Sequence, residues 1–131
     1  MLNLNETTFA AVVAQARQDA AQHPRWLNAI TRAVRELTEN PYIERQADHP
    51  GLLIGSTSGS VYTANGVCQC QAFTHGHACW HRAAARLVRL HDEAQRREIA
   101  RQIDTALAQT DRAARLAAAE EAAALLNECF A

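Results

Sequence analysis

The sequence contains no lysine; all thirteen of its basic residues are arginine. A phosphate-binding loop that ends in Gly-Lys-Ser or Gly-Lys-Thr is therefore excluded, and so is Schiff-base chemistry through a lysine. Fourteen Asp and Glu residues balance the arginines and leave a formal net charge of −1. This balance argues against a uniformly basic coat for nucleic acid and against a polyanionic tail. Any contact with an anion would be made by planar guanidinium groups.

Aromatic residues are also scarce, with two Trp, two Tyr and three Phe among 131 residues. Large side chains bury most of the apolar surface of a core, and much of the apolar content here is alanine. The length corresponds to one domain with a thin core. We therefore expect a bound metal or a partner to reinforce the fold.

Long apolar runs are missing. No stretch of about 18 apolar residues could cross a membrane, so we expect no membrane segment. The first residues lack the basic segment and apolar core of a signal peptide. We therefore expect a cytoplasmic location, where thiols stay reduced. The four cysteines then need an explanation other than disulfide bonds.

The N-terminal third has the apolar spacing of two helices, over about residues 7–22 and 25–39. Pro24 fits the first position of the second helix, and Asn40-Pro41 ends it. We expect residues 1–41 to form a helical hairpin that covers a sheet.

The next segment reads as a small antiparallel meander. Asn65-Gly66 is a strong hairpin signal and predicts a type I′ turn that sends the chain back. The expected strands cover residues 42–45, 52–56, 60–64 and 67–70.

Helical periodicity resumes at Trp80 and continues to about Leu90. The apolar phase shifts between Asp92 and Arg97, which predicts a kink or a new start, and a last helix begins at about Asp111. We therefore expect C-terminal helices over residues 92–131. The Ala-rich stripe from Leu116 to Phe130 would suit packing on the body or close helix pairing between chains.

The most informative segment has the outline C-x-C, eight residues, then C-x-H. Its four side chains are Cys68, Cys70, Cys79 and His81. Three thiolates and one imidazole make a complete tetrahedral set for Zn²⁺. The sequence therefore predicts one structural zinc ion.

The spacing also predicts how the local backbone should hold these ligands. Cys68 and Cys70 are two residues apart, so on one strand their side chains share a face. Residues two apart on an α-helix point in nearly opposite directions. Cys79 should therefore lie just before a helix and His81 in its first turn, where the positive helix terminus faces the thiolates.

This outline resembles the SWIM zinc finger, whose pattern is C-x-C, a variable spacer and C-x-H. The resemblance covers about residues 52–90, and the hairpin before Cys68 and the apolar helix positions after His81 match the family's ββα layout. It implies that Cys68, Cys70, Cys79 and His81 bind zinc. It also implies DNA binding or protein–protein interaction, because SWIM modules occur in chromatin-remodelling ATPases, mutator-type transposases, kinases and small bacterial proteins. Trp80 replaces a basic residue that is typical of the family.

Other interpretations of these residues remain open at this point. His75 or His77 could replace His81 as the fourth ligand. Reduced core cysteines with an incidental histidine would leave no metal site at all. A catalytic zinc would need an open coordination position and a nearby general base. No carboxylate lies between Asp48 and Asp92, so we expect no enzymatic activity.

Arg82, Arg86 and Arg89 are spaced to share one face of the helix that follows the ligands. Residues 51–101 carry six Arg and three acidic residues, whereas residues 102–131 carry two Arg and five acidic residues. The face could contact phosphates of a nucleic acid, or it could be the solvated side of an amphipathic helix.

Together these patterns predict an α+β protein with three parts: a helical segment (1–41), a SWIM-type finger (42–91) and a helical extension (92–131). The predicted function is a non-enzymatic zinc protein that binds nucleic acid, DNA in particular, through Arg82, Arg86 and Arg89. The alternative is an interaction adaptor or homodimer that uses the C-terminal helix and binds no nucleic acid.

Overall fold

The computed structural model describes the backbone of residues 1–130 and the side chains of residues 1–129. The chain divides into two compact units, Met1–Ala94 and Gln95–Ala131. The first unit is a mixed α+β structure and contains both the predicted helical hairpin and the predicted finger segment. The three-part division at residues 41 and 91 stays a prediction.

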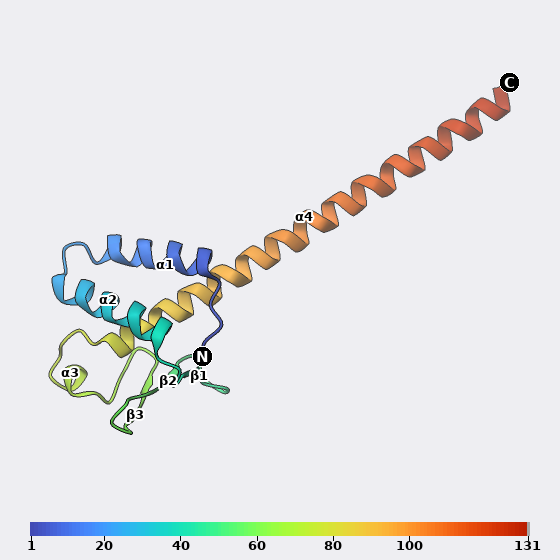
Figure 1. Ribbon diagram of the computed structural model, residues 1–131. Helices are drawn as coiled ribbons and strands as arrows, with labels where there is room; N and C mark the ends of the chain where they lie inside the picture. The colour runs from blue at the N-terminus through green and yellow to red at the C-terminus, as the bar shows by residue number, and fades with distance from the viewer. Residues whose placement is uncertain (131) are drawn as a thin grey trace. The chain divides into compact units, whose positions relative to one another are not determined.

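The first two helices pack side by side as a hairpin (Figure 1). Helix α1 covers Glu6–Asp19, and the side chain of Asn5 caps it by accepting a 3.0 Å hydrogen bond from the amide of Thr8. Helix α2 covers Pro24–Glu39, with proline at its first position as predicted.

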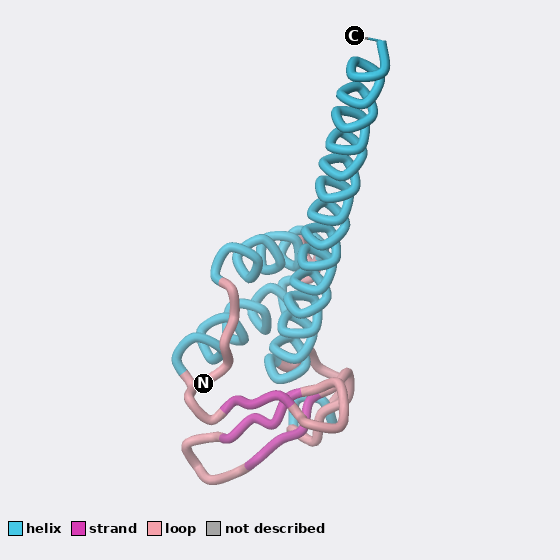
Figure 2. The backbone as a smooth tube through the Cα atoms, turned by 90° about the vertical axis from the view of Figure 1, so that its right-hand side faces the viewer, coloured by secondary structure: helices cyan, strands magenta, loops and turns pink. Residues whose placement is uncertain are grey.

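The sheet has three antiparallel strands in the order β1-β2-β3, drawn in magenta in Figure 2. They cover Ile43–Arg45, Leu52–Gly55 and Val61–Ala64. In β2, Leu52 and Ile54 are buried while Leu53 between them is exposed, which is the alternation expected of a sheet with one covered face. The strands predicted over residues 42–64 are thus confirmed to within one residue at each end.

The fourth predicted strand, over residues 67–70, is wrong. The chain returns only as far as an isolated bridge between Ala64 and Cys68. The predicted type I′ turn is also wrong: it needs a positive φ at Asn65, and among the described residues only glycines have one. Asn65 instead accepts a 3.4 Å hydrogen bond from the amide of Val67 through its side chain, so the connection is a three-residue loop.

The C-terminal part of the chain forms a single helix, α4, over Trp80–Phe130. The predicted new helix starts, between Asp92 and Arg97 and at Asp111, are wrong. The apolar phase does change there, but residues 80–130 contain neither glycine nor proline, so nothing interrupts the backbone hydrogen bonds. In the described part of the chain, no helix is long and apolar enough to cross a bilayer.

The core of the first unit joins both N-terminal helices, the sheet and the start of α4. Ala33, Ile54, Ala64 and Ala84 are completely buried, and Leu87 nearly so. Alanine at these positions lets the backbones approach closely, which compensates in packing density for the shortage of aromatic residues.

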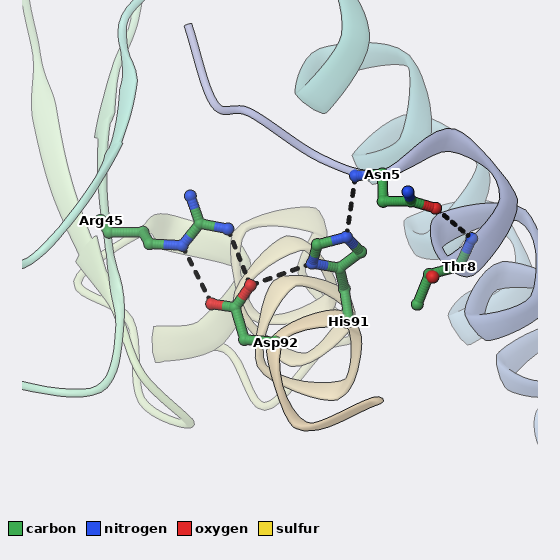
Figure 3. Close-up of polar contacts among 5 residues, drawn as sticks. All are labelled: Asn5, Thr8, Arg45, His91 and Asp92. Carbon is green, nitrogen blue, oxygen red and sulfur yellow. Dashed lines mark hydrogen bonds and ion pairs between the residues drawn. The ribbon is translucent and has the colours of Figure 1, made fainter. Parts of the chain in front are cut away.

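A hydrogen-bonded chain connects three parts of the first unit (Figure 3). The amide of Asn5 donates to Nε2 of the buried His91 at 3.0 Å, so Nε2 is an acceptor and the ring proton lies on Nδ1. That nitrogen is 2.9 Å from Oδ1 of Asp92, and Arg45 donates twice to the same carboxylate, at 2.7 and 2.9 Å. The bonds tie the N-terminal segment and β1 to α4.

We predict that Asp92→Asn lowers the free energy of unfolding by about 1 kcal/mol at pH 7, since the ion pair is partly solvated. The hydrogen bonds from Arg45 hold the pKa of Asp92 below its ordinary 3.8. The stabilisation is therefore present above that value and is lost as the pH falls through the lowered one. Urea denaturation of both proteins at pH 7 and below pH 4 measures this difference.

Glu93→Gln is the matched control, because Glu93 forms a longer, more exposed pair with Arg89 at 3.7 Å. It should change the free energy of unfolding by less than about 0.5 kcal/mol. Equal destabilisation of the two variants would contradict the role assigned to Asp92.

Candidate metal centre and adjoining arginine cavity

Three cysteines and one histidine converge at the end of the sheet. The sulfur atoms of Cys68, Cys70 and Cys79 and a ring nitrogen of His81 all lie within 4.8 Å of one another, and all four residues are buried. Cys68 and Cys70 follow β3, while Cys79 directly precedes α4 and His81 lies in its first turn. The predicted placement of Cys79 and His81 about a helix start is confirmed.

The loop between the two ligand pairs is short and regular. A one-turn helix, α3 (Gln71–Thr74), follows Cys70. Gly76 then adopts φ +71°, and the amides of Gly76 and His77 donate to the carbonyls of Phe73 and Ala72 at 2.9 and 2.8 Å. This pair of bonds is a Schellman motif, which ends a helix and reverses the chain. The reversal brings Cys79 back to Cys70.

Two aromatic rings hold the imidazole of His81. The ring of Trp80 lies 4.1 Å from it and that of Tyr62 lies 4.7 Å from it, measured between centroids. Burial, followed by the charge of Arg32, lowers the pKa of His81 to about 4. The imidazole is therefore neutral at physiological pH, which is the form that binds metals. Its Nδ1 is buried and has no hydrogen-bond partner among the described residues.

The three thiols differ in their tendency to ionise. Burial raises the pKa of Cys68 to about 12 and also raises that of Cys79. Burial acts on Cys70 in the same direction, but the amides of Phe73 and Ala72 and the neighbouring thiols outweigh it, so the pKa of Cys70 is lowered. A divalent cation would reverse the cost of ionising such buried thiols and release their protons.

The donor set fits Zn²⁺. Zinc–sulfur bonds of about 2.3 Å in a tetrahedron place sulfur atoms roughly 3.8 Å apart, and the four donor atoms here all lie within 4.8 Å of one another. Backbone amides already face the sulfurs: Cys70 donates to Sγ of Cys68 at 3.4 Å, and Arg82 donates to Sγ of Cys79 at 3.5 Å. A metal ion would also satisfy the orphaned Nδ1 of His81. The residues could therefore hold one metal ion.

His75 and His77 lie outside this cluster. Both are exposed. Nδ1 of His75 is 2.7 Å from the carbonyl of Gln71, and Nδ1 of His77 is 3.3 Å from a guanidinium nitrogen of Arg25. The geometry therefore favours His81 as the fourth ligand over either alternative.

Arginines lie beside the cluster. Arg25 and Arg32 line a cavity of about 480 Å³ together with Cys70, Cys79 and His81. The guanidinium of Arg32 is also 5.1 Å from the centre of the Trp80 ring. Zinc bound by three thiolates and a neutral imidazole would carry a net charge of −1, and these guanidinium groups would offset that charge.

The predicted arginine face forms part of a second cavity, of about 390 Å³. It is lined by Arg82, Arg86, Arg89, Ala85, Trp26, Pro50, Gly51, Asn65 and Gly66. The side chains of Arg86 and Arg89 are exposed. The structure thus brings together the three arginines that the sequence singled out and adds a wall that spacing alone did not predict.

Arg82 is held more firmly than the other two. Its guanidinium lies 5.0 Å from the ring centre of Phe73 and 5.4 Å from that of Trp26. Its Nε is buried and makes no hydrogen bond within residues 1–130. Because the same residue's amide faces Cys79, Arg82 links the cavity to the metal centre. Sequence reasoning missed the roles of Trp26, Phe73 and Tyr62, although the scarcity of aromatics was a usable signal.

Comparison with protein-family models, curated proteins and solved structures finds no match to this chain. The functional assignment therefore depends on the chemistry and geometry of the site itself. That geometry provides a buried Cys₃His set that could bind a metal ion, compatible with a zinc finger.

We predict that Gly76→Ala lowers the free energy of unfolding by about 1 kcal/mol and weakens metal binding several-fold. The cost comes from the backbone, because a Cβ at Gly76 would meet nothing within 4 Å but alanine disfavours φ +71°. Competition with a chromophoric chelator measures the affinity, and urea denaturation measures the stability.

Gly59→Ala is the control, since Gly59 has φ +85° and equally open surroundings but lies in the β2–β3 loop. It should cost similar stability and leave metal affinity unchanged. Equal metal affinities for both variants would contradict a role of the Gly76 turn in forming the site.

Proposed function

We propose that Cys68, Cys70, Cys79 and His81 bind one structural Zn²⁺ in a finger of the SWIM type. The observation that carries this proposal is the buried convergence of three thiols and one neutral imidazole within 4.8 Å. The resemblance of the C-x-C and C-x-H pairs to the family pattern supports it. The free state of all three cysteines also agrees with a cytoplasmic location, which we propose for this protein.

The proposed zinc has a structural role and no catalytic one. Four protein ligands complete a tetrahedral sphere and leave no position for a water molecule or a substrate. The site joins the segment that follows β3 to the start of α4. Binding energies of structural zinc sites are on the order of 10–16 kcal/mol, comparable to the stability of a whole domain.

We predict that Cys70→Ser abolishes stoichiometric zinc binding and unfolds the finger. Native mass spectrometry should find one zinc ion per wild-type chain and none in the variant. Cys129→Ser is the control because Cys129 is exposed and distant in sequence from the ligands; it should keep the zinc. Unchanged circular dichroism and melting after complete chelation would show that the metal does not stabilise the fold.

We further propose that the cavity of Arg82, Arg86 and Arg89 binds the phosphates of a nucleic acid. Three arginines line this cavity and no acidic residue does, which favours an anionic ligand. Arg89 also forms a 3.7 Å ion pair with Glu93, which a bound phosphate would replace. The family's basic position between the last two ligands is Trp80 here, and this ring packs on His81. A phosphate contact would therefore come from the next turns of α4 instead.

We predict that Arg86→Ala/Arg89→Ala weakens binding to duplex and single-stranded DNA alike. Removing one phosphate-binding arginine should reduce the slope of log Kobs against log salt concentration by about 0.9 for duplex DNA, so the double variant should reduce it by about 2. Fluorescence anisotropy at several salt concentrations measures this slope. Both side chains are exposed, so the variant should fold normally.

The matched control is Arg17→Ala/Arg35→Ala, which removes the same charge from α1 and α2. It should leave the salt slope nearly unchanged. Equal weakening of binding in the two double variants would indicate non-specific attraction, and no binding by the wild type at low salt would reject the nucleic-acid proposal while leaving the zinc proposal intact.

A further inference from the structure

The cavity of about 390 Å³ at the arginine face is lined by more than basic side chains. Trp26 of α2 lines it, and so do two turns of the chain, Pro50-Gly51 before β2 and Asn65-Gly66 after β3. Its volume lies within the range of pockets that enclose small organic ligands, roughly 300–1,000 Å³. The cavity therefore has room for one small group beside the arginines.

The two turns are packed tightly against each other. A Cβ placed on Gly51 would lie 2.8 Å from the carbonyl oxygen of Ala64 and 2.9 Å from Cβ of Asn65. Real side chains do not tolerate such distances, so this approach of the two backbones requires glycine. The turns therefore form one ordered part of the lining, which lowers the cost of binding a ligand there.

Asn65 adds a hydrogen-bonding group to the lining. Its Oδ1 accepts the 3.4 Å bond from the amide of Val67, and the residue is exposed. In the described part of the chain, its Nδ2 donates no hydrogen bond. An asparagine amide of this kind pairs well with the polar edge of a nucleic-acid base.

Trp26 adds a flat apolar surface. The residue is partly exposed, and the guanidinium of Arg82 lies 5.4 Å from its ring centre. The same guanidinium lies 5.0 Å from the ring centre of Phe73, so contacts with two rings hold Arg82 in place. Bases stack both on aromatic rings and on guanidinium planes. The lining thus combines stacking surfaces with positive charge.

This combination discriminates between paired and unpaired nucleic acid. In a double helix each base is stacked and paired, and it enters a protein cavity only if it is flipped out, which costs unstacking and unpairing energy. A duplex can still place its phosphates on the exposed Arg86 and Arg89 while its bases stay outside. An unpaired strand can use both the arginines and the cavity.

We propose that the ligand of this cavity is single-stranded nucleic acid, with phosphates on Arg86 and Arg89 and one unpaired base inside, against Trp26 and Asn65. This inference rests on the proposed nucleic-acid function and names the class of nucleic acid that the site prefers. No acidic residue lines the cavity, so no carboxylate there repels the phosphates that flank the inserted base.

Fluorescence anisotropy of the full chain with three DNA probes tests this proposal. The probes are an unstructured single strand, the duplex of the same sequence and length, and an abasic strand of that length. The single strand should bind about tenfold more tightly than the abasic strand, because stacking of one base contributes about that factor, and more tightly than the duplex. A single strand that does not bind more tightly than both other probes would overturn base insertion. Absence of any binding at low salt would instead reject the underlying nucleic-acid function.

Substitutions in the lining test which residues receive the base. Trp26→Leu should bring the ratio of single-strand to abasic-strand affinity close to one, whereas Trp26→Phe keeps a ring and should retain most of the ratio. Tyr42→Leu is the matched control, because Tyr42 is an aromatic residue that is 65% exposed and lies outside the lining of this cavity. It should keep the full ratio.

Circular dichroism and zinc content show whether each variant is folded. Asn65→Ala changes an exposed side chain and tests the cavity even if Trp26→Leu does not fold; it should lower the ratio several-fold. An unchanged ratio in folded Trp26→Leu or in Asn65→Ala, or a loss of the ratio in Tyr42→Leu, would overturn the proposal.

Discussion

The convergence of three thiols and one imidazole between β3 and the start of α4 is the constraint on which the rest of the first unit depends. Cys68 and Cys70 follow the last strand, Cys79 directly precedes the long helix and His81 lies in its first turn. The neighbouring core is built largely of alanine, which contributes little burial per residue. A metal ion bound at this point would supply the connection that large side chains provide in other domains of this size.

Secondary structure could be predicted well where local chemistry decides it. Pro24 and the alternation of β2 located their elements within a residue or two. The errors arose where the hydrogen bonding of the surrounding backbone outweighed a local sequence signal. At Asn65-Gly66 the Asn65 side chain accepts a bond from the amide of Val67, and no type I′ turn forms. A change of apolar phase after Asp92 did not interrupt a helix that lacks any breaking residue.

The ligands could be predicted because their types and spacing are almost sufficient to define a tetrahedral site. The residues that pack against the ligands could not be predicted in this way. Trp80 is next to His81 in sequence, but Tyr62 and Arg32 reach the imidazole only through the fold. The same holds for His91, whose Nε2 accepts a bond from Asn5, 86 positions away. Long-range polar contacts of this kind leave no periodicity and no motif in the sequence.

The all-arginine composition has different consequences in the two units. In the first unit, guanidinium planes lie over Trp26, Phe73 and Trp80, and an ammonium group would stack less well on these rings. In the second unit, Arg101 pairs with Glu98 and Arg115 with Asp111 along the helix itself. Arginine thus serves both as a flat packing surface around a small aromatic core and as a partner in ion pairs within one helix.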